Sequence, residues 1–344
     1  MCFLRTLLCM SKRTGGFLHL FSHFLFKDHT MLLSCIGAFL ALAAAFFALK
    51  YLTNLLPTDH GRAYAVEGIK SKGKPTSAGL LFITVFALFT LLFVPLKPEY
   101  IFYVVLIEAA MIFGYLDDKA SKPWSEYRKG LLDLMISFLT ALTFTLFNST
   151  DIVFPILGFS FMMPAPVYLL FGTVLVWVAI NVTNCTDGVD GLSSTLTILS
   201  IAAMTVLSSL LGTIGGFTGS GIIMIAVLIA YLWFNTNPSM LLMGDAGSRA
   251  LGVFMAILAM QTHQPFAYLI LCLVFILDGG AGIVKISLKR FLHISILKNT
   301  TTPFHDHFRK KIGWSNPQVT IRMSILHLLL CSLYLLIVYV MLHR

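Results

Sequence analysis

Carboxylates are scarce in this chain, and several of them lie in short polar segments between apolar runs. Among 344 residues there are only 15 Asp and Glu. Three segments combine carboxylates with glycines or amides: GYLDDKASK (114–122), NVTNCTDGVDG (181–191) and NTNPSMLLMGDAGSRALG (235–252). Adjacent carboxylates such as Asp117 and Asp118 repel each other unless they share a cation or a proton. Oxygen ligands favour Mg²⁺ or Ca²⁺, and Mg²⁺ takes few carboxylates plus substrate phosphates, so these segments predict a divalent metal site.

Basic and histidine-containing segments complement this acidic set. KSKGKPTSAG (70–79) places lysines beside glycines, before an expected helix N-terminus, where the backbone can approach an anion. A basic loop retained at the cytoplasmic face would look similar. TTTPFHDHFRKKIGW (300–314) carries two histidines and three basic residues after a proline. Such histidines can be metal ligands, although beside Mg²⁺ they would more naturally donate hydrogen bonds to phosphate or sugar oxygens, or they are simply solvated. Together the segments indicate a phosphorylated substrate.

The elements that must position these residues are membrane helices. Hydrophobic residues make up 58% of the chain and charged residues 11%, against roughly a quarter charged in soluble domains. Apolar runs without polar alternation favour helices over a β-barrel. A span needs about 20 apolar residues, and ten candidates are found at about 31–56, 77–96, 99–115, 130–148, 166–183, 192–212, 216–234, 248–263, 264–288 and 322–342. The sequence therefore predicts an all-α integral membrane protein with about ten transmembrane helices.

The distribution of Lys and Arg predicts the topology. Basic residues gather in loops 57–76, 116–129 and 289–321, whereas the intervening loops hold only Lys97. Because basic loops are retained on the cytoplasmic side, both termini are expected outside and the catalytic cleft at the cytoplasmic face. Residues 1–30 oppose this rule, since they carry four basic residues. We interpret 1–30 as a tail, either a surface helix or sequence upstream of a true start at Met31, and 31–344 as one polytopic membrane domain.

Some ionisable residues lie inside the predicted spans, away from the polar loops. Glu108, Asp278 and Lys285 are costly in lipid and are expected to be paired or to face a cavity. For Asp278, a role as a buried hydrogen-bonding partner is at least as well founded as a catalytic one. The run DGGAG (278–282) predicts a kink or break in the ninth helix that opens a cleft to lipid. Asp59, Glu126 and Asp133 fit ordinary solvated loop carboxylates.

At these residues the chain resembles a known family, the polyprenyl-phosphate N-acetylhexosamine-1-phosphate transferases. NCTDGVDGLSS is similar to its N-x-T-D-G-x-D-G-L segment, and GYLDD, FNTNPSMLLMGDAGSRALG and TPFHDHFRKKIGW resemble its other motifs in the same order, from about Gly61 to Ser315. The resemblance implies ten helices with both termini outside and a lipid-open groove near the ninth helix. Two departures are that Asp306 replaces the middle of three consecutive histidines and that Asp278 stands for a glutamate.

Within this family, KGKPTSAG and PFHDHF followed by GW resemble members that use UDP-MurNAc-pentapeptide. The resemblance implies transfer of phospho-MurNAc-pentapeptide to undecaprenyl phosphate, giving lipid I and UMP, by a Mg²⁺-dependent enzyme of the bacterial cytoplasmic membrane. Membrane lipids are expected partners, nucleic acid is not, and a homodimer is left open. The alternatives are the same chemistry on UDP-N-acetylglucosamine, a nucleotide-sugar transporter that uses the three intramembrane charges, or an inactive scaffold.

The resemblance also suggests residue roles. The acceptor phosphate has a second pKa of about 6 and is largely dianionic near pH 7, so bringing two anions together is the main problem. Each unit repulsion at 4 Å costs about 4 kcal/mol at an effective dielectric near 20. We expect Asp245 and Asp117 to bind Mg²⁺, and Asp118 to accept a proton from the prenyl phosphate, to orient it, or to act as a covalent nucleophile. His305 is expected to be catalytic and substrate-binding. The remaining expected substrate-binding residues are Lys70, Lys74, Lys129, Asn181, Asn184, Asp187, Asp190, Asn235 and His307.

Overall fold

The computed structural model describes residues 30–59, 61, 71–213 and 216–343, and the predicted tail 1–30 and Lys70 lie outside them, except for Thr30. The long helices are α3 (Thr30–Tyr51), α5 (Gly79–Phe93), α6 (Pro98–Asp118), α7 (Glu126–Phe147), α8 (Ala165–Thr186), α9 (Leu192–Leu210), α10 (Gly216–Asn235), α11 (Gly244–Gln261) and α16 (Asn316–Leu342). Between α11 and α16 lie the 3₁₀ turn η2 (Pro265–Ala267), α12 (Tyr268–Leu271), α13 (Leu273–Phe275), the π-helical η3 (Ile276–Gly280), α14 (Ala281–Phe291), α15 (Phe304–His307) and the π-helical η4 (Phe308–Ile312).

Helices dominate the fold, as predicted. Each of the ten predicted apolar segments coincides with a helix or, for 264–288, with a bent series of helices. In the part of the chain that the structure describes, six helices are long and apolar enough to cross a membrane, or seven if the bent series counts as one span. The protein is thus a multi-pass membrane protein of the all-α class. The number of ten crossings remains a prediction.

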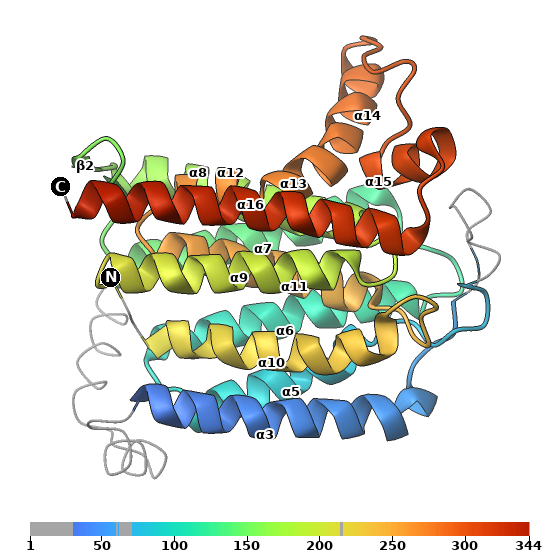
Figure 1. The fold of residues 1–344 in the computed structure, drawn as a ribbon, viewed down its shortest axis with the longest axis horizontal. Coiled ribbons are helices and arrows are strands. Elements are labelled where there is room, and N and C mark those ends of the chain that lie inside the picture. Colours follow the sequence, from blue (N-terminus) through green and yellow to red (C-terminus); the bar gives the residue numbers. More distant parts are fainter. Residues whose placement is uncertain (1–29, 60, 62–70, 214–215, 344) are drawn as a thin grey trace.

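One short hairpin, which the sequence did not indicate, interrupts the helices. Strands β1 (Asp151–Phe154) and β2 (Phe159–Met162) pair antiparallel between α7 and α8. Gly158 adopts a φ of +68° in the connecting turn, a conformation that glycine takes at no steric cost. This hairpin lies at the end of the bundle where α3 begins and α16 ends (Figure 1).

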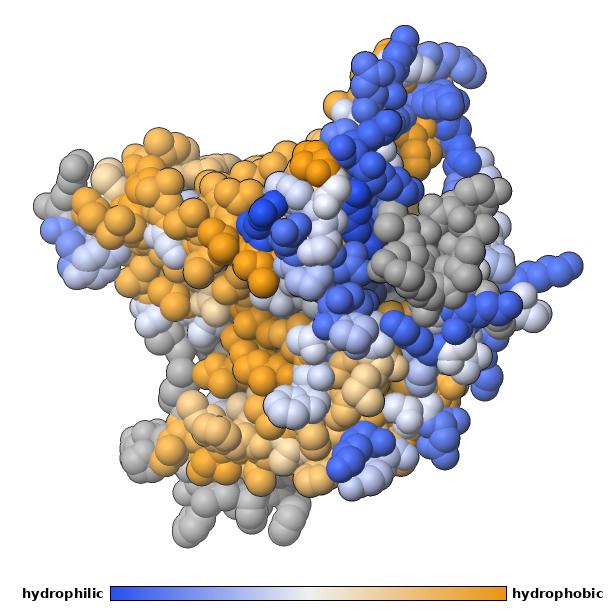
Figure 2. All heavy atoms as spheres, turned by 45° about the vertical axis from the view of Figure 1, so that its right-hand side comes forward, coloured by the Kyte–Doolittle hydropathy of each residue, from blue (hydrophilic) through white to orange (hydrophobic). Residues whose placement is uncertain are grey.

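Helix α11 forms the centre of the bundle. Every residue from Asp245 to Met260 is buried. Helices α6 and α8 approach it closely at glycines, since a Cβ on Gly114 would overlap the carbonyl of Asp245 and a Cβ on Gly252 would lie 2.6 Å from Ile180 Cα. Exposed apolar side chains instead cover the outside of the bundle, and hydrophilic residues gather at one end (Figure 2).

The ninth predicted span is broken, but not where the sequence indicates. The helical segments Pro265–Leu271 and Leu273–Phe291 meet at an angle of 68°, so the break lies at Cys272 and not at 278–282. Around Asp278 the helix continues through the wider π-helical turn η3, and Gly279 lies against the Val182 carbonyl of α8. At the break, Ser200 Oγ donates a 2.8 Å hydrogen bond to the freed carbonyl of Leu271. A neighbouring helix therefore compensates the interrupted backbone.

Candidate active site

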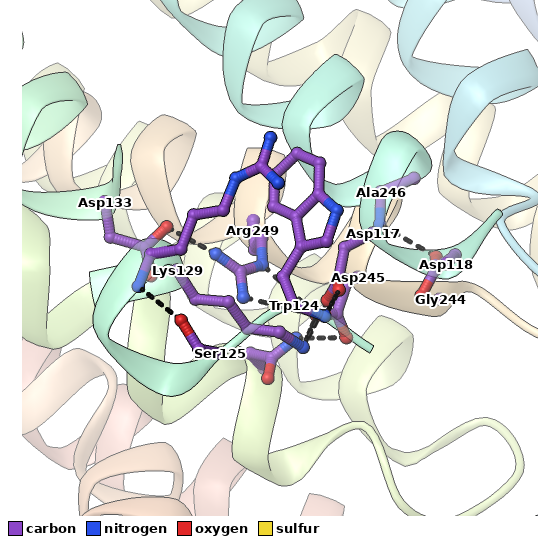
Figure 3. Close-up of polar contacts among 12 residues, drawn as sticks. Asp117, Asp118, Trp124, Ser125, Lys129, Asp133, Gly244, Asp245, Ala246 and Arg249 are labelled. Carbon is purple, nitrogen blue, oxygen red and sulfur yellow. Dashed lines mark hydrogen bonds and ion pairs between the residues drawn. The ribbon is translucent and has the colours of Figure 1, made fainter. Parts of the chain in front are cut away.

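Three of the predicted carboxylates converge where α6 ends and α11 begins. Asp117 and Asp118 are the last residues of α6, and Asp245 is the second residue of α11. The close approach of the two helices at Gly114 brings these ends together. Lys129 Nζ from α7 forms an ion pair with Asp117 Oδ2 and lies 3.5 Å from Asp245 Oδ2 (Figure 3). Two carboxylates from different helices thus share one cation.

Asp245 is surrounded by hydrogen-bond donors from other elements. Asn184 Nδ2 at the end of α8 donates to Asp245 Oδ1 at 3.0 Å. On the other oxygen, Oδ2, Arg249 donates through Nε at 3.3 Å and Nη2 at 3.2 Å. Together with Lys129 these contacts fix the direction of both carboxylate oxygens.

Arg249 also reaches Asp133 on α7, with 2.6 Å between Nη1 and Oδ1 (Figure 3). Asp133 is 4% exposed and Arg249 6% exposed. The interpretation of Asp133 as a solvated loop carboxylate is therefore wrong, because α7 begins at Glu126 and carries Asp133 into the protein. Arg249 was missed by the sequence analysis, although a basic residue inside a predicted span, 248–263, was the available signal.

Asp118 is held by a different set of hydrogen bonds. Its Oδ2 accepts a 2.7 Å hydrogen bond from Ser77 Oγ and a 3.4 Å bond from the Ala246 backbone N–H (Figure 3). Gly244, at a φ of +72°, lies so close that a Cβ there would overlap Asp118 Oδ2. The PTSAG segment, predicted to approach an anion, therefore lies beside one of the predicted catalytic carboxylates.

A second group of predicted residues joins the loops at this end. Asp190 Oδ2 accepts from Asn237 Nδ2 at 2.9 Å and from the Ser239 N–H at 3.1 Å, and Lys74 Nζ donates to Ser239 Oγ at 3.1 Å. Asn235 is buried, with its amide bonded to the Gly191 N–H and the Leu241 carbonyl. These contacts hold the loop after α10 against the end of α8.

The segment 300–314, called the histidine loop below, packs directly on the 184–191 segment. His305 Nδ1 lies 2.7 Å from Asp278 Oδ2, and the His305 N–H donates to Asp278 Oδ1 at 2.7 Å. Gly188 lies against His305 Nε2, and Arg309 Nη2 donates to the Gly188 carbonyl at 3.0 Å. Asp278 is thus a buried hydrogen-bonding partner of His305, which is one of the two roles expected for it from the sequence.

The other predicted residues are placed less centrally. Asn181 Nδ2 donates to the Trp177 carbonyl. Asp187 comes directly after α8, and its backbone N–H donates to the Asn184 carbonyl. His307 Nδ1 accepts from the Thr301 N–H at 3.3 Å. Among the described residues no hydrogen-bond partner is found for Glu108 Oε1, so of the two expectations for this residue, pairing or facing a cavity, pairing is not seen at that oxygen.

The donor set at the centre of the site fits a magnesium ion. Within the described ranges no group of three or more His, Cys, Asp or Glu forms a complete metal site. Magnesium needs no such group, because it uses one or two carboxylates plus waters and substrate phosphates. Asp117 and Asp245 face the same ammonium group, so a cation between their Oδ2 atoms would be stabilised.

Known proteins resemble this chain in sequence. A family described as Glycosyl transferase family 4 matches residues 100–263, from α6 to α11. The phospho-N-acetylmuramoyl-pentapeptide-transferase of Treponema pallidum (strain Nichols) is 36% identical over 315 residues, covering 85% of this chain and 86% of the relative. The chain belongs to the phospho-N-acetylmuramoyl-pentapeptide-transferase family.

A more distant member agrees over nearly the same extent. The phospho-N-acetylmuramoyl-pentapeptide-transferase of Desulfotalea psychrophila is 28% identical over 361 residues, covering 90% of this chain and 97% of the relative. The cluster of Asp117, Asp118, Asp245, Lys129 and Asn184 lies within the residues that the family model matches.

Proposed function

We propose that this protein transfers phospho-MurNAc-pentapeptide from UDP-MurNAc-pentapeptide to undecaprenyl phosphate, forming lipid I and UMP for peptidoglycan synthesis. Membership of the phospho-N-acetylmuramoyl-pentapeptide-transferase family carries this proposal. The convergence of Asp117, Asp118 and Asp245 at one end of a helical bundle supports it. Phosphoryl transfer between two anions needs charged groups and metal ions that are held close to the phosphates.

We further propose that the protein lies in the bacterial cytoplasmic membrane with ten crossings, both termini outside and the site facing the cytoplasm. The concentration of Lys and Arg in alternate loops of the sequence supports this topology. The start of α3 and the end of α16 lie at the same end of the bundle, which supports an arrangement with both termini on one side (Figure 1). A donor made in the cytoplasm would then meet a lipid acceptor that enters laterally.

Magnesium would be held by Asp117 and Asp245, and when bound it would neutralise charge on the donor diphosphate and the leaving UMP. Lys129 would contact the same phosphates, and its position between these carboxylates supports this role. Arg249 and Asn184 keep Asp245 oriented. Holding charged groups in place before substrate binds is how such sites lower the barrier.

Asp118 is proposed to meet the prenyl phosphate. Ser77 and the Ala246 N–H both bond to its Oδ2, and neither bonds to its Oδ1. Asp118 would orient the acceptor or take its residual proton, whereas a covalent aspartyl-phosphate route would use it as nucleophile. His305, held by Asp278, would contact the donor diphosphate or sugar next to the 184–191 segment, where Asn181, Asp187, Asp190 and His307 would bind the nucleotide or sugar.

The deciding experiment measures UMP release by detergent-solubilised protein with undecaprenyl phosphate and UDP-MurNAc-pentapeptide, with Mg²⁺ and then with excess chelator. Release that stops on chelation is expected. Release only with UDP-N-acetylglucosamine would refute the donor assignment. No release with either donor, in protein that unfolds cooperatively on heating, would refute the reaction.

A further inference from the structure

A cavity of about 530 Å³ lies beside the histidine loop, outside the carboxylate site. It is lined by Lys285, Lys298, Asn299, Thr300, Thr301 and Lys311. The three lysines come from α14, the segment after it and η4, and the lining contains no Asp or Glu. Three ammonium groups around one cavity repel each other, so an anion bound among them would be stabilised.

The walls of this cavity are tied to the rest of the protein. Lys285 Nζ donates a 2.8 Å hydrogen bond to the Thr300 carbonyl, which fastens the segment after α14 back onto that helix. The Thr301 N–H donates to His307 Nδ1, which fastens the same segment to the histidine loop. The lysines therefore line a folded concavity with amide and hydroxyl donors between them.

Exposed apolar side chains lie beside Lys285 in the sequence of α14. Val284 is 50% exposed and Ile286 is 59% exposed, on either side of Lys285 in the chain, and Phe291 is 69% exposed. After the 68° bend at Cys272, α14 leaves the bundle and projects to the side, near the end of the bundle where hydrophilic residues gather (Figure 1). Hydrophobic residues are interspersed with hydrophilic ones on this projecting arm (Figure 2).

We propose that the cavity binds the phosphate headgroup of an anionic phospholipid, whose acyl chains pack on the apolar side chains of α14. A soluble phosphate would engage the lysines alone, whereas a lipid phosphate uses the lysines and the exposed apolar residues together. Basic groups at a membrane surface attract anionic lipids in this way, and lysine stems lie readily along apolar surface. The site does not depend on the transferase reaction.

The test measures binding of a fluorescent phosphatidylglycerol to the full-length protein in neutral detergent micelles, by anisotropy. The variant Lys298→Gln/Lys311→Gln leaves the Lys285 contact with Thr300 intact. It is expected to weaken phosphatidylglycerol binding about tenfold or more, with no change for phosphatidylcholine. The matched control, Lys50→Gln/Lys122→Gln, removes two exposed lysines elsewhere and should bind like the parent protein.

Two outcomes would overturn the proposal. Equal losses in the cavity variant and the control would mean that binding follows net charge and not this cavity. Displacement of the lipid by millimolar inorganic phosphate would identify a soluble-anion site. Both readouts use binding alone, so they stay valid whether or not the protein releases UMP.

Discussion

At the scale of single residues, the site depends on how a few buried charges are shared. Asp245 accepts hydrogen bonds from Arg249 and Asn184 and lies near Lys129, while Arg249 is also bonded to Asp133. Removing one partner of a buried ion pair leaves a charge without compensation, which costs about 3–5 kcal/mol. Each member of this network should therefore affect both stability and the position of Asp245.

Arg249→Met tests this network. We expect the variant to lose about 3–5 kcal/mol of stability, seen as a lower melting temperature in detergent, and to release UMP more slowly. Adding Asp133→Leu should restore much of the stability, because the second buried charge is then gone as well. Additive losses in the double variant would contradict the coupling.

The matched control for Arg249→Met is Arg290→Met. Arg290 Nη1 lies 2.6 Å from Glu126 Oε2, the same distance as in the buried pair, but the two side chains are 48% and 76% exposed. Exposed pairs contribute about 0–1 kcal/mol. A large loss of stability in this control would mean that burial is not what makes the Arg249 pair important.

Lys129→Gln separates two effects of the shared ammonium group. The lysine neutralises Asp117 and Asp245, and its charge opposes a second cation between them. The variant should release UMP at least about tenfold more slowly when Mg²⁺ is saturating, because a phosphate-neutralising group is lost. It should also need less Mg²⁺ for half-maximal rate. Lys122→Gln, exposed on the preceding loop, should change neither value, and an unchanged Mg²⁺ requirement in Lys129→Gln would disprove the shared position.

The sequence allowed the carboxylates of the site to be predicted, but not their counter-charges. Asp117, Asp118 and Asp245 stand out because they interrupt apolar runs beside glycines, and the structure brings them together. Asp133 and Arg249 lie 116 residues apart, and only the packing of α7 beside α11 pairs them. No local pattern indicates that contact.

At the scale of elements, glycines set the distance between α6 and α11. A Cβ on Gly114 would overlap the backbone of Asp245, so the two helices approach closely one turn before Asp117. The apolar runs predicted these helices, because a run of about 20 residues reports the length of a span. The same runs could not locate the break at Cys272. The break involves a hydrogen bond that Ser200 of α9 donates to the Leu271 carbonyl, a contact between residues far apart in the sequence.

Gly114→Ala should therefore damage the site through the helix packing. The added methyl group meets backbone atoms that cannot rotate away, so α6 must move and Asp117 with it. We expect a lower melting temperature and UMP release reduced about tenfold or more, since small displacements of catalytic groups have large effects. Gly130→Ala on α7 is the matched control, because nothing lies within 4 Å of a Cβ there. Wild-type activity in Gly114→Ala would show that the close approach is not required.

At the scale of the whole molecule, hydropathy and burial diverge in α11. This helix carries Asp245 and Arg249 and is not among the helices that pass a length and hydropathy test for crossing a membrane, yet all its residues from Asp245 to Met260 are buried. A helix surrounded by other helices meets protein and not lipid, so it can hold charges that a lipid-facing helix cannot. The predicted count of ten crossings and the six or seven apolar spans differ partly for this reason.

The proposed topology can be tested with two engineered cysteines. Ser160→Cys lies on the exposed strand β2 of the hairpin, and Ser121→Cys lies on the exposed loop after α6, beside the carboxylates. If basic loops are cytoplasmic, a membrane-impermeant maleimide added to sealed right-side-out vesicles should label Ser160→Cys at once and Ser121→Cys only after permeabilisation. The parent protein, treated in the same way, gives the background from the native cysteines. The reverse labelling pattern would place the carboxylate site outside the cell, where a cytoplasmic nucleotide donor could not reach it.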